Sequence, residues 1–273
     1  MPGPDPFRGR VAVITGGAGG IGFAMARAFA ARGARIALAD LDEAGMAQRA
    51  KTLAVGGTEV LCVPTDVTQR ESVASLADAV WKRFGAAHVV CNNAGIAIAG
   101  PLLQMTPDDW RLTMDIDFWG VVYGVEAFTK RLIEQRQGGH IVNTASMAGL
   151  VGMQWLGVYS AAKFAVVGLS ESLRRELEPH GIGVSVLCPM VVETAITENS
   201  MRLRGMQAPK APSVQQPPAG AMRGGVIGAD EVARRVVRAV ERNDLYVLTH
   251  PEQREFLRRR AARLDAMFEP GTW

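Results

Sequence analysis

A tyrosine and a lysine four residues apart are the side chains of this chain best suited to acid–base chemistry. In the run Tyr159-Ser160-Ala161-Ala162-Lys163, helical spacing would place both on one face. A free phenol has a pKa of about 10, so it is a poor base near neutrality unless a cation such as Lys163 favours the phenolate. Ser146 ends an apolar run, 139–146, that predicts a buried strand, and its hydroxyl could position a substrate oxygen. The three residues predict one site, although a solvent-facing pair on an ordinary helix is an alternative that they leave open.

A glycine-rich turn near the amino terminus is suited to binding phosphate. The β-branched run 10–15 breaks directly into Gly16-Gly17-Ala18-Gly19-Gly20-Ile21-Gly22, and a helix is predicted from Ile21 to about Arg32. The first amides of such a helix are free to bind an anion, and the glycines let a pyrophosphate approach the backbone. The glycines match G-x-G-x-x-G, T-G-x-x-G-x-x-G and T-G-x-x-x-G-x-G at once, so the turn alone does not choose among these motifs.

An aspartate ends the second predicted strand, 35–40, about twenty residues after the glycines. A dinucleotide-binding fold places the adenosine ribose at this point. A carboxylate accepts hydrogen bonds from a ribose diol but repels a 2'-phosphate, and neither Gly19 nor Leu41 offers a cation to such a phosphate. Asp40 therefore favours NAD over NADP. A helix-capping role is the alternative, and it suits Asp42 better.

Seven apolar strands alternate with helical segments along the chain. The predicted strands span 10–15, 35–40, 59–63, 88–91, 139–145, 183–187 and 245–248. This alternation predicts an α/β fold with a Rossmann-type, doubly wound, parallel seven-stranded sheet, helices on both faces and ligands at the carboxyl ends of the strands. The length of 273 residues, with 48% hydrophobic residues, predicts a single dinucleotide-binding catalytic domain over 1–273.

Taken together, these motifs resemble the short-chain dehydrogenase/reductase family, in its compact single-domain branch, over nearly the whole chain. The markers come in the family's order: the turn 15–22, Asp66-Val67, Asn92-Asn93-Ala94-Gly95, Ser146, and Tyr159 with Lys163. The resemblance selects the T-G-x-x-x-G-x-G reading of the turn and sets Asp66-Val67 against the adenine. It implies this cofactor-binding set: Gly16, Gly20, Ile21, Gly22, Asp40, Asp66, Val67, Asn93, Tyr159, Lys163, Val192 and Thr194.

The reaction that the resemblance implies is oxidation of a secondary alcohol to a ketone, or the reverse, by hydride transfer with NAD. Tyr159 is expected to act as the acid or base, and Lys163 to lower its pKa and hold the nicotinamide ribose. Ser146 is expected to hydrogen-bond the substrate oxygen. Thr194 is expected to hydrogen-bond the nicotinamide carboxamide, with Val192 packed along the ring.

Two residues depart from the family pattern. Asp117 stands where an asparagine usually completes a catalytic tetrad with serine, tyrosine and lysine. An aspartate there is expected to keep the proton-relay position while adding a charge that opposes phenolate formation. Met190 replaces the glycine of the usual proline–glycine pair, so its backbone is expected to have an ordinary negative φ.

The substrate is expected to be uncharged and hydrophobic, with a cyclic or aromatic body. Residues near Ser146 and after the Asn92-Asn93-Ala94-Gly95 motif would form an apolar wall of its pocket, namely Ile96, Ile98, Met147, Met153, Gln154, Trp155 and Leu156. The stretch 195–228 is rich in proline, glycine and methionine, and we interpret it as an irregular substrate lid. A plain flexible insertion is the alternative.

Other partner classes find little support in the sequence. A net charge of +3 gives no case for nucleic-acid binding, and the run Arg258-Arg259-Arg260 is expected to be the solvated face of a terminal helix, 251–268, rather than a phosphate site. That helix is expected to dock through Phe256, Leu257, Leu264 and Met267. The four histidines form no metal-ligand motif, so no metal is expected, and no segment reaches membrane-spanning length. Three cysteines without paired spacing favour a reducing, cytoplasmic location.

The resemblance also implies a homo-oligomer, a tetramer or dimer, built on the helices that begin near Pro107 and Gly157. Apolar residues compatible with that packing, or equally with the core, are Trp119, Val122, Phe128, Val166 and Leu169. Two alternatives concern activity. The enzyme could act in the cell as a ketone reductase, or the chain could be an NAD-binding regulatory protein whose site is impaired by Asp117 and Met190.

Overall fold

A parallel seven-stranded sheet forms the centre of the computed structural model, which describes residues 5–205 and 225–268. The strands lie in the order β3-β2-β1-β4-β5-β6-β9, and every neighbouring pair is parallel. Their bounds are β1 Val11–Thr15, β2 Arg35–Asp40, β3 Val60–Pro64, β4 Val89–Asn92, β5 Gly139–Thr144, β6 Ile182–Cys188 and β9 Tyr246–Leu248. The predicted doubly wound sheet is confirmed, and no predicted strand end differs from the structure by more than one residue.

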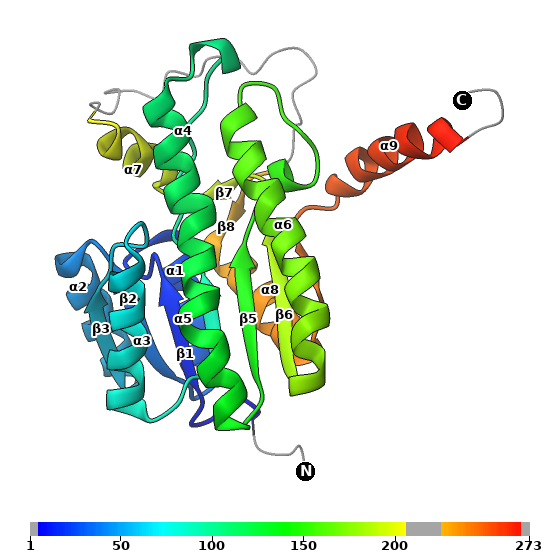
Figure 1. Ribbon diagram of the computed structural model, residues 1–273. Helices are drawn as coiled ribbons and strands as arrows, with labels where there is room; N and C mark the ends of the chain where they lie inside the picture. Colours follow the sequence, from blue (N-terminus) through cyan, green and yellow to red (C-terminus); the bar gives the residue numbers. More distant parts are fainter. Residues whose placement is uncertain (1–4, 206–224, 269–273) are drawn as a thin grey trace.

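Helices cover both faces of this sheet (Figure 1). On one face lie α1 (Gly20–Ala30), α2 (Glu43–Val55) and α8 (Ala229–Arg242), whose buried residues include Met25, Phe29 and Val236. On the other lie α3 (Arg70–Phe84), α5 (Gly120–Gln135) and α6 (Gly157–Leu177), with Val80, Phe128 and Leu173 in the core. Because both faces are covered, β1 and β6 are buried along their whole length.

The chain reverses its winding direction between β1 and β4. The segments that start at β1 build outward to β2 and β3, and those that start at β4 build the other way to β5, β6 and β9. At such a switch point the loops after the two strands separate, and a ligand crevice opens at the carboxyl ends. The glycine turn follows β1, and the Asn92-Asn93-Ala94-Gly95 motif begins at the end of β4, so both predicted motifs lie at this crevice.

A π-helical turn joins two α-helices above β4. The helix α4 (Pro107–Met114) continues through the π turn η2 (Asp115–Trp119) into α5 without a break in helical backbone angles. One extra residue per turn rotates the side chains that follow, and such turns occur often at functional sites. Here the turn directs Asp117 into the protein, where it is fully buried, while Trp119 remains 43% exposed and stacks on Tyr123.

The expected irregular lid is partly helical, so that prediction was wrong over 196–203. Within 195–205 and 225–228 the structure has the helix α7 (Ile196–Leu203) and the strand β8 (Ile227–Gly228), which pairs with β7 (Val192–Glu193). The second half of the helix is held by two contacts: the Ser200 hydroxyl accepts a hydrogen bond from Ala97 N at 2.8 Å, and Arg204 pairs with Asp109 of α4 at 2.8 Å. The rest of the expected lid, 206–224, lies outside the described residues.

The terminal helix α9 (Gln253–Asp265) projects away from the body of the molecule (Figure 1). Its start is fixed, because Gln253 is fully buried and donates a hydrogen bond to Cys188 O at 2.7 Å. Leu264, near the end of α9, is 53% exposed, although Arg260 lies over the Phe164 ring of α6. The docking predicted for Leu264 was therefore wrong, whereas the arginine run 258–260 is exposed as predicted.

The remaining short elements are the 3₁₀ turns η1 (Leu102–Gln104), η3 (Met147–Gly149), η4 (Glu178–His180) and η5 (Ala266–Phe268). Cys91 and Cys188 are buried, Cys62 is half-buried, and all three are free thiols. His88, His140 and His250 are buried and hydrogen-bonded. Within 5–205 and 225–268, none of the helices combines the length and the apolar character needed to cross a lipid bilayer.

Candidate active site

A cleft of about 1380 Å³ opens at the carboxyl ends of the central strands. It brings together side chains from β2, η2, β5 and α6 that lie far apart in the sequence. All but one of the predicted site residues line it, namely Gly16, Gly20, Ile21, Asp40, Asp66, Val67, Asn93, Asp117, Ser146, Tyr159, Lys163, Val192 and Thr194. Gly22 is the exception, because it lies under the glycine turn and not at the cleft surface.

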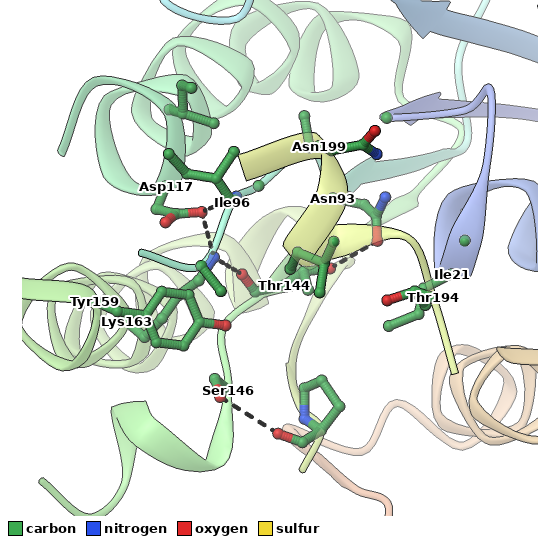
Figure 2. A pocket seen from close by; sticks show the side chains of 18 of the residues that line it. Ile21, Asn93, Ile96, Asp117, Thr144, Ser146, Tyr159, Lys163, Thr194 and Asn199 are labelled. Carbon is green, nitrogen blue, oxygen red and sulfur yellow. Dashed lines mark hydrogen bonds and ion pairs between the residues drawn. The ribbon is translucent and has the colours of Figure 1, made fainter. Parts of the chain in front are cut away.

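Tyr159 and Lys163 lie on the first turns of α6 and face the cleft together (Figure 2). The Lys163 ammonium is almost completely buried, donates a hydrogen bond to the Thr144 carbonyl at 3.0 Å and pairs with Asp117 Oδ1 at 3.1 Å. Its Nζ lies 5.6 Å from the centre of the Tyr159 ring. The ammonium is thus held in place by β5 and η2, and its charge acts on the phenol from a fixed position.

Ser146 lies two residues after the end of β5, beside the Tyr159 hydroxyl (Figure 2). Its Oγ accepts a hydrogen bond from Ala148 N at 3.1 Å, which caps the turn η3. The same hydroxyl donates to Pro189 O at 3.4 Å. These contacts fix the direction of the Ser146 side chain while leaving its oxygen at the cleft surface, so it can hydrogen-bond a small polar group held beside Tyr159.

The charges around Tyr159 act in opposite directions. Burial raises the pKa of the phenol, the Lys163 ammonium lowers it, and Asp117 raises it again, so that the net pKa lies above its ordinary value. Burial lowers the pKa of Lys163, but Asp117 and Tyr159 outweigh it, and Lys163 holds its proton more tightly than a free lysine. Lys163 therefore lowers the pKa of Tyr159, as expected, but burial raises that pKa by more.

Asp117 is the departure from the family pattern with the largest electrostatic effect. Its side chain is fully buried; Oδ1 takes the Lys163 ion pair and a hydrogen bond from Ile96 N at 3.1 Å, while Oδ2 has no hydrogen-bond partner in the described residues. Burial raises its pKa, and Lys163 opposes that rise. A Cβ on Gly95 would lie 2.7 Å from Oδ1, so glycine at that position leaves room for the carboxylate.

Steric contacts explain the glycine turn. Gly16 and Gly20 have φ of +66° and +53°, and a Cβ on Gly22 would lie 2.1 Å from the Gly16 carbonyl oxygen. A Cβ on Gly19, by contrast, would meet nothing within 4 Å, which agrees with an incidental glycine at that position. Gly19 precedes α1 without a side-chain cap, so the first amides of the helix are free to bind an anionic group in the cleft.

Asp40 lies at the end of β2, with its carboxylate at the opposite end of the cleft from Tyr159. Its Oδ2 accepts a hydrogen bond from Ala18 N at 3.0 Å, which ties the glycine turn to β2. Sequence reasoning missed a cation close by: Arg49 on α2 lines the cleft, donates to Ala18 O at 3.0 Å and lies over the Phe23 ring. No local sequence motif predicts that Arg49 lies at the cleft, because it is nine residues after Asp40 and reaches the cleft only through the packing of α2.

The remaining predicted cofactor residues hold the strand ends together as well as lining the cleft. Asn93 donates from its side chain to Thr15 O at 2.9 Å, joining β4 to β1, so its amide group has a structural partner. Asp66 Oδ1 accepts from the Thr68 amide and hydroxyl. A Cβ on Gly20 would lie 3.3 Å from Thr194 Cγ2, which shows that Thr194 packs against the glycine turn. Val67 and Val192 add apolar surface.

An apolar wall lines the other end of the cleft. It includes Ile96, Leu112, Ile116, Met153, Trp155, Leu156, Met190 and Ile196. Ile98 and Met147, expected in this wall, are instead fully or nearly fully buried in the fold. Met190 has an ordinary backbone, as expected, whereas Trp155 has φ of +65°, a region that bulky side chains rarely adopt.

A model of the family described as short chain dehydrogenase matches residues 10–204. The chain belongs to the short-chain dehydrogenase family. This chain is 41% identical to the putative oxidoreductase SadH of Mycobacterium tuberculosis, over 71% of each chain. It is 35% identical to 1-deoxy-11-beta-hydroxypentalenate dehydrogenase of Streptomyces avermitilis, over 88% of this chain and 84% of that one. It superposes with a TM-score of 0.86 on a short-chain dehydrogenase/reductase from Burkholderia phymatum solved in complex with NAD, at 37% identity over 97% of both chains.

These comparisons establish that the short-chain dehydrogenase is an oxidoreductase of the alcohol dehydrogenase type. Its small-molecule substrate and its dinucleotide would share the one cleft, because the glycine turn, Tyr159 and the apolar wall all line it. Among the residues that the structure describes, no three histidine, cysteine, aspartate or glutamate side chains gather into a group able to bind a metal ion.

Proposed function

We propose that the protein catalyses NAD-dependent oxidation of a hydrophobic secondary alcohol to a ketone, or the reverse reduction, with the substrate's reacting carbon held between Tyr159 and the nicotinamide. One observation supports this most strongly. A buried ammonium, a phenol and a serine hydroxyl converge at one end of a cleft whose other end has a glycine turn and the Asp40 carboxylate. An acid–base group and a dinucleotide site in one cleft are what this reaction requires.

The residues present fit NAD. The free amides at the start of α1 are suited to the pyrophosphate, and the Cβ contacts at Gly16 and Gly22 explain why that approach is open. Asp40 would hydrogen-bond the adenosine ribose, Asp66 and Val67 would contact the adenine, and Ile21, Asn93, Val192 and Thr194 would line the nicotinamide half. When bound, NAD supplies a nicotinamide ring that exchanges a hydride with the substrate carbon.

Tyr159 handles the proton in this proposal. During oxidation it removes the proton of the substrate hydroxyl, and during reduction it returns one to the carbonyl oxygen. Ser146 turns its hydroxyl hydrogen from the 3.4 Å contact with Pro189 O to the same oxygen and orients it. Lys163 stabilises the phenolate from its fixed position and would hydrogen-bond the nicotinamide ribose, and Asp117 orients Lys163 at the relay position. A positively charged oxidised nicotinamide beside Tyr159 would lower the pKa of the phenol further.

The substrate is proposed to have a hydrophobic body, because Met153, Trp155, Leu156, Met190 and Ile196 form the wall beside Ser146. The relative from Streptomyces avermitilis is named for a hydroxypentalenate, which is compatible with a hydroxylated substrate. The preferred direction, oxidation or ketone reduction, depends on the cofactor ratio around the enzyme. We also propose one catalytic domain over 1–273 with 195–228 as its substrate lid, a dimeric or tetrameric assembly and a cytoplasmic location.

A second candidate is an NAD-binding protein that turns over poorly. The observation in its favour is the Asp117–Lys163 ion pair, since Asp117 opposes the effect of the ammonium on the Tyr159 pKa. Tight NAD binding without turnover of any alcohol or ketone would support this candidate.

The test is NADH formation by the purified protein with NAD and a panel of aliphatic, alicyclic, aryl and steroidal secondary alcohols. Tyr159→Phe should lose turnover by roughly 10²- to 10⁴-fold while NAD still binds, because the variant lacks only the proton-transfer group. Tyr123→Phe, which changes a tyrosine outside the cleft, is the matched control and should keep full activity. Equal activity in Tyr159→Phe would rule out the proposed mechanism.

A further inference from the structure

A cluster of buried polar side chains lies where β9 leads into α9, and the proposed reaction does not use it directly. Thr249, His250 and Gln253 are at most 4% exposed. None of these three side chains lines the cleft, although β9 ends at the same edge of the parallel sheet as the strands that carry the site. Burying polar groups is costly unless they are hydrogen-bonded, so the partners of this cluster indicate what it holds.

Gln253 uses the whole hydrogen-bonding capacity of its amide. Its Oε1 accepts hydrogen bonds from Thr249 N and His250 N, each at 2.9 Å. Its Nε2 donates to Cys188 O at 2.7 Å and to Met147 Sδ at 3.3 Å. A side-chain amide with two acceptor sites and two donors, all engaged, is fixed in one orientation. Gln253 therefore joins the turn before α9 to the end of β6 and to η3.

Thr249 holds the other side of the loop that follows β6. Its Oγ1 accepts a hydrogen bond from Met190 N at 3.4 Å and lies 2.7 Å from His250 Nδ1. The His250 Nε2 lies 2.8 Å from Gly225 O, which can only accept, so in the neutral imidazole Nε2 carries the proton and Nδ1 accepts from the Thr249 hydroxyl. The hydroxyl is thereby oriented with a lone pair left for Met190 N.

The two anchors lie on either side of Pro189, whose carbonyl faces Ser146. Pro189 O accepts a hydrogen bond from Met147 N at 2.8 Å, and the Ser146 hydroxyl lies 3.4 Å from the same oxygen. Because the cluster fixes the residues before and after Pro189, it fixes this carbonyl as well. The peptide that follows Ser146 and the oxygen from which its hydroxyl turns to a substrate thus both depend on the cluster.

We propose that Gln253 is a positioning residue for the reaction: by holding the loop 188–190, it sets the direction of the Ser146 hydroxyl toward the substrate oxygen. The inference rests on the proposed function, and it adds a residue that touches neither substrate nor cofactor. Proton and hydride transfer depend steeply on geometry, since a displacement of about 1 Å can lower the rate by as much as about 10²-fold. A role in stability alone would leave the contribution of Ser146 to kcat intact.

The test is a double-mutant cycle between Gln253→Met and Ser146→Ala, with kcat and KM measured for NAD and an alcohol of the panel. Methionine is unbranched like glutamine and of similar size, but it has no amide. Gln253→Met should lower kcat by roughly tenfold or more and leave the KM for NAD unchanged. In the Ser146→Ala background the same substitution should lower kcat by less than about twofold, because the group that Gln253 positions is gone. Equal fold-losses in both backgrounds would overturn the inference.

Gln135→Met is the matched control. Gln135, on α5, also joins backbone segments through its amide, with Nε2 donating to Ala87 O at 2.6 Å and to Gly138 O at 3.2 Å. It lies at the amino ends of β4 and β5 and does not line the cleft. Gln135→Met should lower the free energy of unfolding and leave kcat unchanged. A loss of kcat equal to that of Gln253→Met would show an effect through stability and reject the positioning role.

Thr249→Val tests the second anchor and decides the matter if Gln253→Met does not fold. Valine has the shape of threonine but lacks the hydroxyl that accepts from Met190 N. This substitution should lower kcat by roughly two- to tenfold in the wild-type background and leave it unchanged in the Ser146→Ala background. An unchanged kcat in the wild-type background would contradict the inference.

Amide hydrogen exchange, followed by mass spectrometry, separates the inference from the proposed function because it needs no turnover. Gln253→Met should speed exchange at least roughly tenfold in the segments 146–150 and 188–190, and Gln135→Met should not. Faster exchange there, in a protein whose wild type turns over no panel alcohol, would reject the proposed reaction and keep the positioning of Ser146. Turnover by the wild-type protein, with exchange unchanged in Gln253→Met, would keep the dehydrogenase assignment and reject the inference.

Discussion

The Asp117 carboxylate lies 3.1 Å from the Lys163 ammonium, and both side chains are almost completely removed from solvent. The cation that should favour a phenolate at Tyr159 is therefore shared with a neighbouring anion. Desolvation of both charges is costly, and the hydrogen bonds from Ile96 N to Asp117 and from Lys163 to Thr144 O offset part of that cost. The pair fixes the position of Lys163 and at the same time weakens its effect on Tyr159.

Replacing Asp117 with asparagine should shift the pH dependence of alcohol oxidation to lower pH. The variant keeps a side-chain oxygen for Ile96 N and Lys163 but loses the negative charge that raises the Tyr159 pKa, so more phenolate is present at a given pH. The measurement is kcat/KM for oxidation as a function of pH in both proteins. An unchanged profile would mean that Asp117 does not act on the titration of Tyr159.

Asp117→Ala should instead affect stability. It leaves the Lys163 ammonium buried with only the Thr144 carbonyl as a partner, and breaking a buried ion pair costs about 3–5 kcal/mol. Denaturant unfolding of Asp117→Ala and Asp117→Asn provides the comparison. Equal unfolding free energies for Asp117→Ala and the wild-type protein would argue against a buried charged pair.

Asp40 and Arg49 should together control the choice between NAD and NADP. Asp40→Ser removes the repulsion toward a 2'-phosphate, and Arg49 is close enough to the same end of the cleft to pair with that phosphate. The ratio of kcat/KM for NADP over NAD should rise at least roughly tenfold, about 1.4 kcal/mol. The double variant Asp40→Ser, Arg49→Gln should lose that gain. If it keeps the gain, Arg49 has no part in the selectivity.

Alanine should be tolerated at Gly19 and not at Gly22. The added Cβ meets nothing within 4 Å at Gly19 but lies 2.1 Å from the backbone oxygen of Gly16 at Gly22. Gly22→Ala must move the turn, with a loss of roughly 1–3 kcal/mol or more in unfolding free energy and weaker NAD binding. Thermal melts and NAD titrations of the two variants test this. Similar behaviour of both variants would contradict the predicted geometry of the turn.

The buried His140 should make the protein less stable in mild acid. Burial lowers the pKa of His140 to about 3, and its Nε2 hydrogen-bonds the Ser185 hydroxyl at 2.8 Å. A histidine in the unfolded chain has a pKa near 6.5, so between about pH 6.5 and 3 the unfolded state binds one more proton than the folded state, and stability falls as the pH falls. From pH 7 to pH 5 this group should remove on the order of 2 kcal/mol.

The measurement for His140 is urea unfolding at several pH values. His140→Gln should reduce the slope of unfolding free energy between pH 6.5 and 5, although the buried His88, whose pKa burial also lowers, contributes to it as well. His180→Gln, at an exposed histidine, should leave the slope as it is. A slope that persists unchanged in His140→Gln would mean that other groups dominate the acid sensitivity.

The sheet could be predicted from the sequence because each strand is a short apolar run between turn residues, and parallel order follows from the intervening helices. The motifs at the strand ends then fix the position of the cleft. Within the site, the proximity of Asp117 and Lys163 could also be predicted. The two residues are far apart in the sequence, but the family pattern places them together, and they form an ion pair in the structure.

Other residues depend on packing that no local pattern records. Arg49 reaches the cleft because α2 folds back beside the glycine turn. Ser200 and Arg204 fix α7 through partners about a hundred residues away, so a segment interpreted as irregular is helical instead. The terminal helix shows the opposite error: its apolar residues fit a docking face, but α9 projects from the body of the molecule and Leu264 is 53% exposed.

The backbone of Trp155 implies a trade between stability and recognition in the wall of the cleft. A bulky residue at φ of +65° carries a strain of about 1–3 kcal/mol, and the Trp155 carbonyl accepts a hydrogen bond from Gly100 N at 2.8 Å that helps to hold it. Glycine at this position would relieve the strain, yet it would also remove the indole from the apolar wall. Glycine at position 155 is thus expected to raise the stability of the fold and to lower the selectivity of the cleft for its substrate.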